Sequence, residues 1–230
     1  MLLRRFVRHI TDQNWFAVGL DVIIVISGIF IGMQLNEWDE KRIEKQQEHI
    51  FLTQLKLDIE HVISSIDYAK QQHAGFIEQG KLALRYLRGE DVFEKYKQEI
   101  ESAFERTHEL PKPQIIYGNF GTLLDGRDHP KISSTTARRE IRNLLNELKT
   151  QIDIYQMIET MIVESTVTNR ELIGFSIPDD PSFPIQYDID ELKRSSIFIH
   201  GLQNALRFHN HAALMLEEMR VHLSKYADKK

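Results

Sequence analysis

An unbroken apolar run near the N-terminus constrains this chain more than any other feature. Residues 16–35 read FAVGLDVIIVISGIFIGMQL, and Asp21 is the one charged side chain among them. At a rise of 1.5 Å per residue, a helix over these residues is about 30 Å long, which matches the hydrocarbon core of a bilayer. A helix in a soluble core rarely stays apolar on every face over this length. The run therefore predicts a transmembrane helix over residues 15–36.

The flanks of the run favour a span that stays in the membrane. Trp15 and Trp38 stand on either side, as aromatic residues do at membrane interfaces. The apolar part of a cleaved signal peptide is shorter, about 7–15 residues, and precedes an Ala-x-Ala-like site. This run instead ends in Gly32-Met33-Gln34-Leu35-Asn36-Glu37. We therefore expect an uncleaved signal anchor that contacts the lipid bilayer.

The charges around the span predict its orientation. Arg4, Arg5 and Arg8 precede the run, whereas acidic residues follow it directly at Glu37, Asp39 and Glu40. The positive-inside rule then places residues 1–14 in the cytoplasm as a short tail and everything after the span outside it. Basic residues at positions 41, 42 and 45 weaken this asymmetry.

Three residues of the span share one helical face. Asp21, Gly28 and Gly32 are spaced by seven and four residues, which returns to nearly the same direction around a helix. Glycines four residues apart let two helix backbones approach closely, and a carboxylate in hydrocarbon is costly unless it faces water or a partner. The stripe predicts association with a second copy or with a polytopic membrane partner. Two alternatives remain open: chance spacing of the glycines, and an Asp21 side chain that extends back to the interface.

The start of the span resembles the B-type subunits of proton-motive-force motors, the TolR, ExbD and MotB proteins. The matching stretch is Leu20-Asp21-Val22-Ile23-Ile24-Val25, behind a short basic tail and before an extracytoplasmic domain. The resemblance implies that Asp21 carries a proton. It covers about twenty of the 230 residues. The rest of the chain departs from that family, because no peptidoglycan-binding domain is recognisable in it.

A second resemblance covers the end of the span. Residues 28–40, GIFIGMQLNEWDE, are similar to the GILIALQINNWNE-like signature of a bacterial family of single-pass proteins with an N-terminal anchor and a helical exterior. The resemblance implies the same architecture and no particular activity. Together with the flanking charges, it leads us to expect a protein of the bacterial inner membrane whose C-terminal domain is periplasmic.

The remainder of the chain has the pattern of long helices. Residues 37–50 are strongly charged and predict a solvated helical stalk. From Leu52 to Leu87 apolar residues alternate at spacings of three and four, the seam of a coiled coil. A shorter helix is expected through about Thr107, and a glycine- and proline-containing loop over residues 115–131. Further stripes run from Ile141 to Ile162 and, behind a cap at Asp188 or Asp190, from Leu192 to Tyr226.

These stripes predict the positions that two later helices bury. We expect Ile141, Leu145, Leu148, Ile152, Tyr155 and Ile162 on the first, and Leu192, Ile199, Leu202, Leu206, His209, Ala213, Leu216, Leu223 and Tyr226 on the second. No strand pattern is visible. The fold class is therefore all-α: one transmembrane helix that continues into an elongated antiparallel helical bundle, with residues 51–230 as the extracytoplasmic domain.

Composition and motifs exclude several kinds of function. A net charge of -5 with mixed charges gives no electrostatic footprint for nucleic acid, and the absence of Cys excludes thiolate metal sites and cysteine nucleophiles. Residues 125–128, DGRD, are too short and too basic for a calcium loop. No nucleotide, hydrolase or zinc-protease motif occurs, so we expect no cofactor and no enzyme.

The histidines supply the remaining candidate sites. Glu218 and His222 are four residues apart, like helical metal ligands, and His211 shares their face; a solvated surface explains them better, so we expect no metal. His73 and His209 both fall on apolar stripes. They are either satisfied core histidines or a buried polar layer whose protonation near pH 6 loosens the bundle.

The sequence favours a membrane-anchored, non-enzymatic scaffold or accessory subunit. Two alternatives remain: a motor subunit with Asp21 as proton carrier, and a periplasmic sensor that signals through a partner, because residues 1–14 are too short for an output domain.

Overall fold

A computed structural model describes residues 15–115, 117–124, 132–166, 172–174 and 185–228, without the side chains of residues 15–17. The described residues form helices and two strands of two residues each, which confirms the all-α fold class. The chain divides into two compact units, Met1–Ile50 and Phe51–Lys230. Helix α2, Trp15–Leu87, contributes residues to both units.

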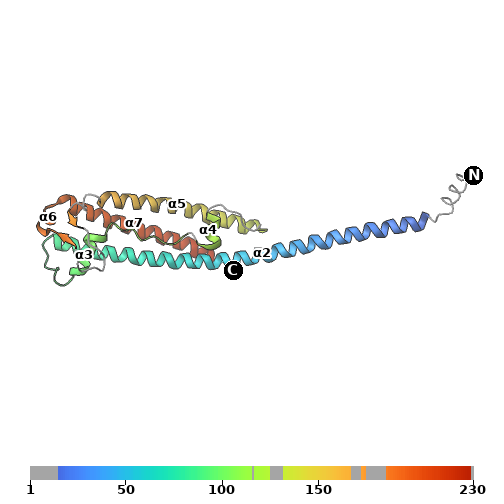
Figure 1. Cartoon of the computed structure of the whole chain (residues 1–230), viewed down its shortest axis with the longest axis horizontal. Helices are drawn as coiled ribbons and strands as arrows, with labels where there is room; N and C mark the ends of the chain where they lie inside the picture. The colour runs from blue at the N-terminus through green and yellow to red at the C-terminus, as the bar shows by residue number, and fades with distance from the viewer. Residues whose placement is uncertain (1–14, 116, 125–131, 167–171, 175–184, 229–230) are drawn as a thin grey trace, which may run out of the picture. The chain divides into compact units, whose positions relative to one another are not determined.

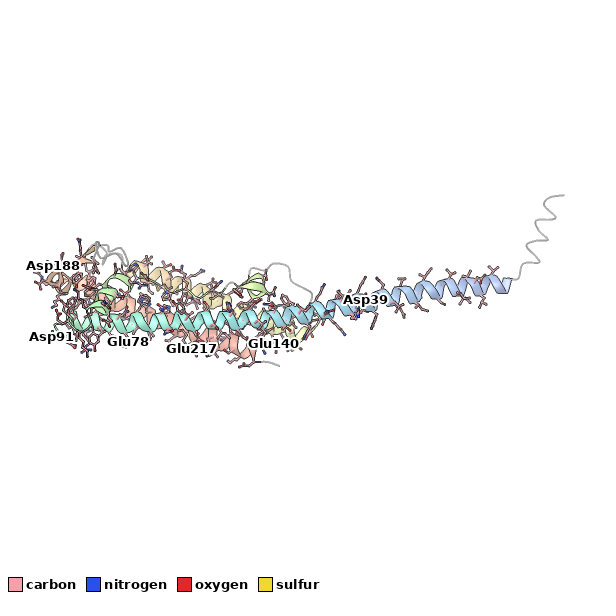
Figure 2. The ribbon with its side chains drawn as sticks, turned by 60° about the horizontal axis from the view of Figure 1, so that its bottom comes forward. Asp39, Glu78, Asp91, Glu140, Asp188 and Glu217 are labelled. Atoms are coloured by element: carbon pink, nitrogen blue, oxygen red, sulfur yellow. The ribbon has the colours of Figure 1, made fainter. Side chains whose placement is uncertain are left out.

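The first unit consists, where it is described, of the beginning of α2. Every residue from 18 to 47 is exposed. Within it lies a window of mean hydropathy 2.1 with no buried part, so the described residues contain one helix long and apolar enough to cross a membrane. After the apolar run, neighbouring turns are joined by polar contacts such as Lys41–Glu37 and Arg42–Asp39, and Asp39 is labelled in Figure 2. Such pairs suit a helix in water.

Three long helices make up the second unit: α2 from Phe51 onward, α5 (Thr135–Thr166) and α7 (Ser196–Ala227). Figure 1 shows them side by side. Helices α2 and α7 are antiparallel, because Asp67 pairs with Arg220 and, further along, His73 contacts His209. Helices α5 and α7 are also antiparallel, because Glu147 pairs with His222 and, further along α5, Tyr155 contacts the same His73 that contacts His209.

Apolar residues at spacings of three and four form the core between these helices. On α2 the predicted seam is buried from Leu55 to Leu87, while Leu52 is half-buried. On α5 the buried positions differ in part from the predicted stripe. Leu144, Gln151 and Ile158 are buried, whereas the predicted Leu145 and Ile152 are half-buried at the edge of the core. On α7 Phe198, Gly201, Ala205, Ala212, Met219 and Ala227 join the core, and the expected Ile199, Leu206, Ala213 and Tyr226 lie at its margin. A helix packed against two neighbours buries a wider stripe than one row of large residues indicates.

A second hydrophobic cluster closes one end of the bundle. It joins the end of α2 to α3 (Lys97–Arg106), α6 (Ile189–Arg194) and the first turn of α7, with Ile100, Leu192 and Phe198 at its centre. Figure 2 shows Asp91 and Asp188 at this end and Glu140 toward the other. Beside it β1 (Ile173–Gly174) and β2 (Gln186–Tyr187) pair in antiparallel fashion. These two short strands have no counterpart in the sequence pattern, and they leave the all-α class unchanged.

The last predicted helix is two helices. The Asp188 side chain accepts from the backbone N–H groups of Asp190 and Glu191 and thus caps α6. Ser195 has extended backbone angles, ends α6, and caps α7 by accepting from Phe198 N–H.

The expected loop over residues 115–131 contains a short helix, α4 (Gly118–Leu124). Its N–H at Asn119 donates to the buried Asp58 carboxylate of α2 at 2.7 Å. Phe120, Leu123 and Leu124 are buried in the core, and the burial of these apolar side chains stabilises α4. Residues 125–131, including the DGRD segment, lie outside the described residues.

Candidate functional sites

The three residues of the stripe on the span are not covered by any other part of the first unit that the structure describes. Asp21, Gly28 and Gly32 are all exposed. A Cβ atom added at Gly28 or Gly32 would meet no atom within 4 Å apart from its chain neighbours and the backbone of its own helix. The helix face that carries these residues can therefore accept another helix at close range.

The predicted interfacial anchors are described only in part. Trp38 is 65% exposed, and the Arg42 guanidinium lies 5.8 Å from its ring centre. Trp15 begins α2, but its side chain lies outside the description, as do Arg4, Arg5 and Arg8. Their role at the membrane interface stays a prediction.

The two seam histidines meet in the middle of the bundle. His73 on α2 and His209 on α7 are both fully buried, with relative exposures of 0%. Their Nδ1 atoms are 2.9 Å apart, a hydrogen-bond distance. Phe76 packs on the His209 ring, with ring centres 5.2 Å apart. The structure thus brings together two residues that are 136 positions apart in sequence.

Each histidine has a second polar partner on its other ring nitrogen. His209 Nε2 lies 2.8 Å from the Thr107 carbonyl oxygen. His73 Nε2 lies 2.8 Å from the Tyr155 hydroxyl of α5. That hydroxyl is in turn 2.5 Å from the Pro111 carbonyl oxygen. The result is one continuous chain of polar groups, which we call the histidine chain, running from Pro111 through Tyr155, His73 and His209 to Thr107.

Burial controls the acid–base properties of the histidine chain. Desolvation, with a smaller effect from neighbouring His209, lowers the pKa of His73 to about 3, against a hydrogen bond with the Pro111 backbone carbonyl that raises it. Desolvation also lowers the pKa of His209, against a hydrogen bond to Thr107 that raises it. The pKa of Tyr155 is raised, first by burial and then by the Glu159 carboxylate. At neutral pH both imidazoles and the phenol are therefore uncharged.

The weak metal-ligand candidates do not converge. His222 Nδ1 lies 2.7 Å from the Glu147 carboxylate of α5, while Glu218 and His211 are exposed. In the part of the chain that the structure describes, no group of three or more His, Asp or Glu side chains is arranged to hold a metal ion. The geometry assigns His222 to a contact between α5 and α7.

Sequence reasoning found the two histidines but missed their partners. Tyr155 was placed on the buried stripe of α5, and a buried tyrosine hydroxyl needs a hydrogen-bond partner; that requirement was the available signal. The carbonyl groups of Thr107 and Pro111 give no signal of their own, because every residue has a carbonyl. Their position depends on how the segment between α3 and α4 crosses the bundle.

Comparison with known proteins adds no relative. No family model, curated protein or solved structure matches the chain. The resemblances of the span to motor subunits and to the bacterial anchor family therefore stay expectations from sequence.

Proposed function

We propose that this protein is a single-pass membrane scaffold or accessory subunit that acts by association of its span with another helix. The observation that carries the proposal is the exposed apolar segment of α2 with Asp21, Gly28 and Gly32 on one face. An isolated span needs no such stripe, since leucine and isoleucine satisfy the bilayer equally well.

The partner is a second copy of this chain or a polytopic membrane protein. A glycine pair lets two backbones approach closely, and the carboxylate of Asp21 then lies near groups of the partner helix that can hydrogen-bond to it. The helical domain after residue 50, which we place in the periplasm, adds a folded unit that can be held beside such a partner.

Association of the span tests this proposal directly. In a two-hybrid assay within a bacterial membrane, Gly28→Ile and Gly32→Ile should each lower the association signal several-fold, because a branched side chain keeps the backbones apart. Gly19→Ile is the matched control. Position 19 is nine residues from position 28, which places it on the opposite side of a helix of 3.6 residues per turn.

The full chain with each substitution should reach the membrane in equal amount, as judged by immunoblotting of membrane fractions. Association of all three variants at the wild-type level would remove the glycine face from the account. Loss of association in Gly19→Ile alone would place the interface on the other side of the span.

A further inference from the structure

The histidine chain has one more hydrogen-bond contact than it has hydrogens available for donation when both imidazoles are neutral. Its four contacts link Pro111 O, Tyr155, His73, His209 and Thr107 O in that order. Both ends are carbonyl oxygens, which only accept. The phenol and two neutral imidazoles supply one hydrogen each, so three hydrogens serve the four contacts. One contact therefore joins two lone pairs whenever both imidazoles are neutral.

The position of the missing hydrogen follows from the end at Thr107. His209 Nε2 must carry a hydrogen to donate to that carbonyl, so Nδ1 of the neutral ring accepts. His73 then donates through its own Nδ1, and its Nε2 presents a lone pair to Tyr155. The single hydrogen of Tyr155 has two acceptors, His73 Nε2 at 2.8 Å and Pro111 O at 2.5 Å.

We infer that the histidine chain is a binding site for one proton, shared by His73 and His209. A proton on His73 Nε2 donates to the Tyr155 oxygen, and the hydroxyl then donates to Pro111, so every contact has its hydrogen. A second proton would put N–H groups on both Nδ1 atoms, which face each other at 2.9 Å. The site accepts the first proton without losing a contact and resists the second.

The geometry fits a proton better than a metal ion. Two nitrogen ligands of a tetrahedral zinc ion, each about 2.0–2.1 Å from the metal, lie about 3.3 Å apart. The two Nδ1 atoms are closer than that, and the described residues offer no third ligand beside them. The distance is that of a hydrogen bond between two rings.

Three ion pairs connect charged groups on the surrounding elements α2, α3, α5, α7 and the segment after α3: Lys70–Glu217, Arg106–Glu109 and Lys112–Glu159. The Arg106 guanidinium also lies 5.8 Å from the ring centre of Phe76, which packs on His209. The Glu159 carboxylate raises the pKa of Tyr155, whereas the pKa of His73 is lowered mainly by burial and then by His209. The Pro111 backbone carbonyl raises the pKa of His73 but only partly offsets burial and His209, so the proton binds below the usual pH range of histidine.

Proton uptake acts on the segment that connects α3 to α4. Thr107 and Pro111 belong to this segment, and both of their carbonyls accept from the histidine chain. Without the added proton, Tyr155 divides its hydrogen between Pro111 and His73. With it, Tyr155 of α5 donates to Pro111 while His209 of α7 still donates to Thr107, so both carbonyls of the segment are hydrogen-bonded.

The number and affinity of the protons can be measured on the full chain in lipid nanodiscs. Histidine rings labelled with ¹⁵N are followed by long-range ¹H–¹⁵N NMR during a pH titration, with His73→Gln and His209→Gln spectra for assignment. The decisive variant is Tyr155→Phe. It removes the hydroxyl that would accept from His73 Nε2, so a proton added there gains no bond to Tyr155 and keeps only its interaction with the Pro111 carbonyl. Tyr117→Phe is the control, since Tyr117 packs on His61 and not on the histidine chain.

The wild type should take up one proton at the pair, at a pH midpoint at least one unit higher than in Tyr155→Phe, a tenfold difference in proton affinity. Tyr117→Phe should titrate like the wild type. Equal midpoints in wild type and Tyr155→Phe would overturn the inference.

The wild-type spectra provide a test that does not depend on the variant folding. After the first uptake, His209 Nδ1 should still have the chemical shift of an unprotonated nitrogen. Simultaneous protonation of both rings, or unfolding before either ring titrates, would also overturn the inference.

Discussion

At the scale of single residues, burial decides what a histidine does in this bundle. His73 and His209 belong to the same residue type as the exposed His211, yet they lie at 0% exposure among apolar neighbours. In water an imidazole titrates near pH 6.5, and here desolvation favours its neutral form. Folding therefore costs free energy whenever these two rings must be charged.

The stability of the bundle should consequently fall in mild acid. A folded-state pKa of about 3 for His73, below its unfolded value of 6.5, means that its stabilisation is present above pH 6.5 and is lost as the pH falls from there toward 3. For a ring that stays neutral, the loss is about 1 kcal/mol between pH 6.5 and 5.5 and approaches about 1.4 kcal/mol per pH unit at lower pH. Urea unfolding of the full chain in detergent, followed by circular dichroism at pH 6.5 and 5.5, measures it.

The control for this experiment is His211→Gln, which changes an exposed histidine and should leave the difference between the two pH values unaltered. A free energy of unfolding that is the same at pH 6.5 and 5.5 would show that the buried pair does not oppose protonation.

At Gly118 both the backbone conformation and the surroundings limit substitution. Its φ of +51° lies in the left-handed region, and an added Cβ would lie 2.5 Å from Asp58 Oδ2, in the carboxylate that holds the start of α4. Gly118→Ala should therefore destabilise the bundle by about 1–3 kcal/mol. Gly75, an exposed position inside α2 with open space around it, is the matched site, and Gly75→Ala should stabilise by about 0.5–1 kcal/mol.

Thermal or urea unfolding of both glycine variants measures the comparison. Equal stability changes at positions 118 and 75 would contradict the strain argument.

At the scale of elements, spacing in the sequence predicted the long helices well, because each buries an apolar stripe of helical period. The α2 seam from Leu55 to Leu87 is buried as expected. The short elements were missed for physical reasons. Helix α4 depends on a carboxylate 61 residues away, and the two-residue strands depend on pairing between Ile173 and Tyr187. Neither contact leaves a periodic pattern.

For the candidate sites too, local spacing predicted the buried positions but not the contacts between distant segments. His73 and His209 could be placed on buried faces from local spacing, but the hydrogen bonds to Tyr155 and to two carbonyls come from chain segments brought together only by folding. The break before α7 was also missed, since Asp188 and Ser195 are both good caps and only the extended backbone at Ser195 makes two helices of one.

The role of Asp21 is decided at the scale of the α2 span. If its carboxylate serves association, Asp21→Asn should keep the association signal near the wild-type level, because an amide still hydrogen-bonds across helices, while Asp21→Leu should lower it several-fold. The bilayer two-hybrid assay used for the glycines measures both.

A proton carrier would give another pattern for Asp21. The Asn variant would then assemble normally and lose proton-dependent activity, because an amide exchanges no proton. Association of Asp21→Leu at the wild-type level would remove Asp21 from the interface.

At the scale of the whole molecule, the account depends on which side of the membrane holds the helical domain. A span with basic residues before it and acidic residues directly after it predicts a cytoplasmic N-terminus. With that orientation, the domain after Ile50 would fold in the periplasm, where the pH follows that of the surroundings and the histidine chain would take up its proton as the pH falls.

Reporter fusion after Lys230 measures this orientation most directly. Alkaline phosphatase is active only in an oxidising compartment, and green fluorescent protein exported in the unfolded state fluoresces only if it remains in the cytoplasm. The account predicts an active phosphatase fusion and a dark fluorescent one, both in the membrane fraction. A silent phosphatase fusion with a bright fluorescent one would contradict it, because the helical domain would then lie in the cytoplasm.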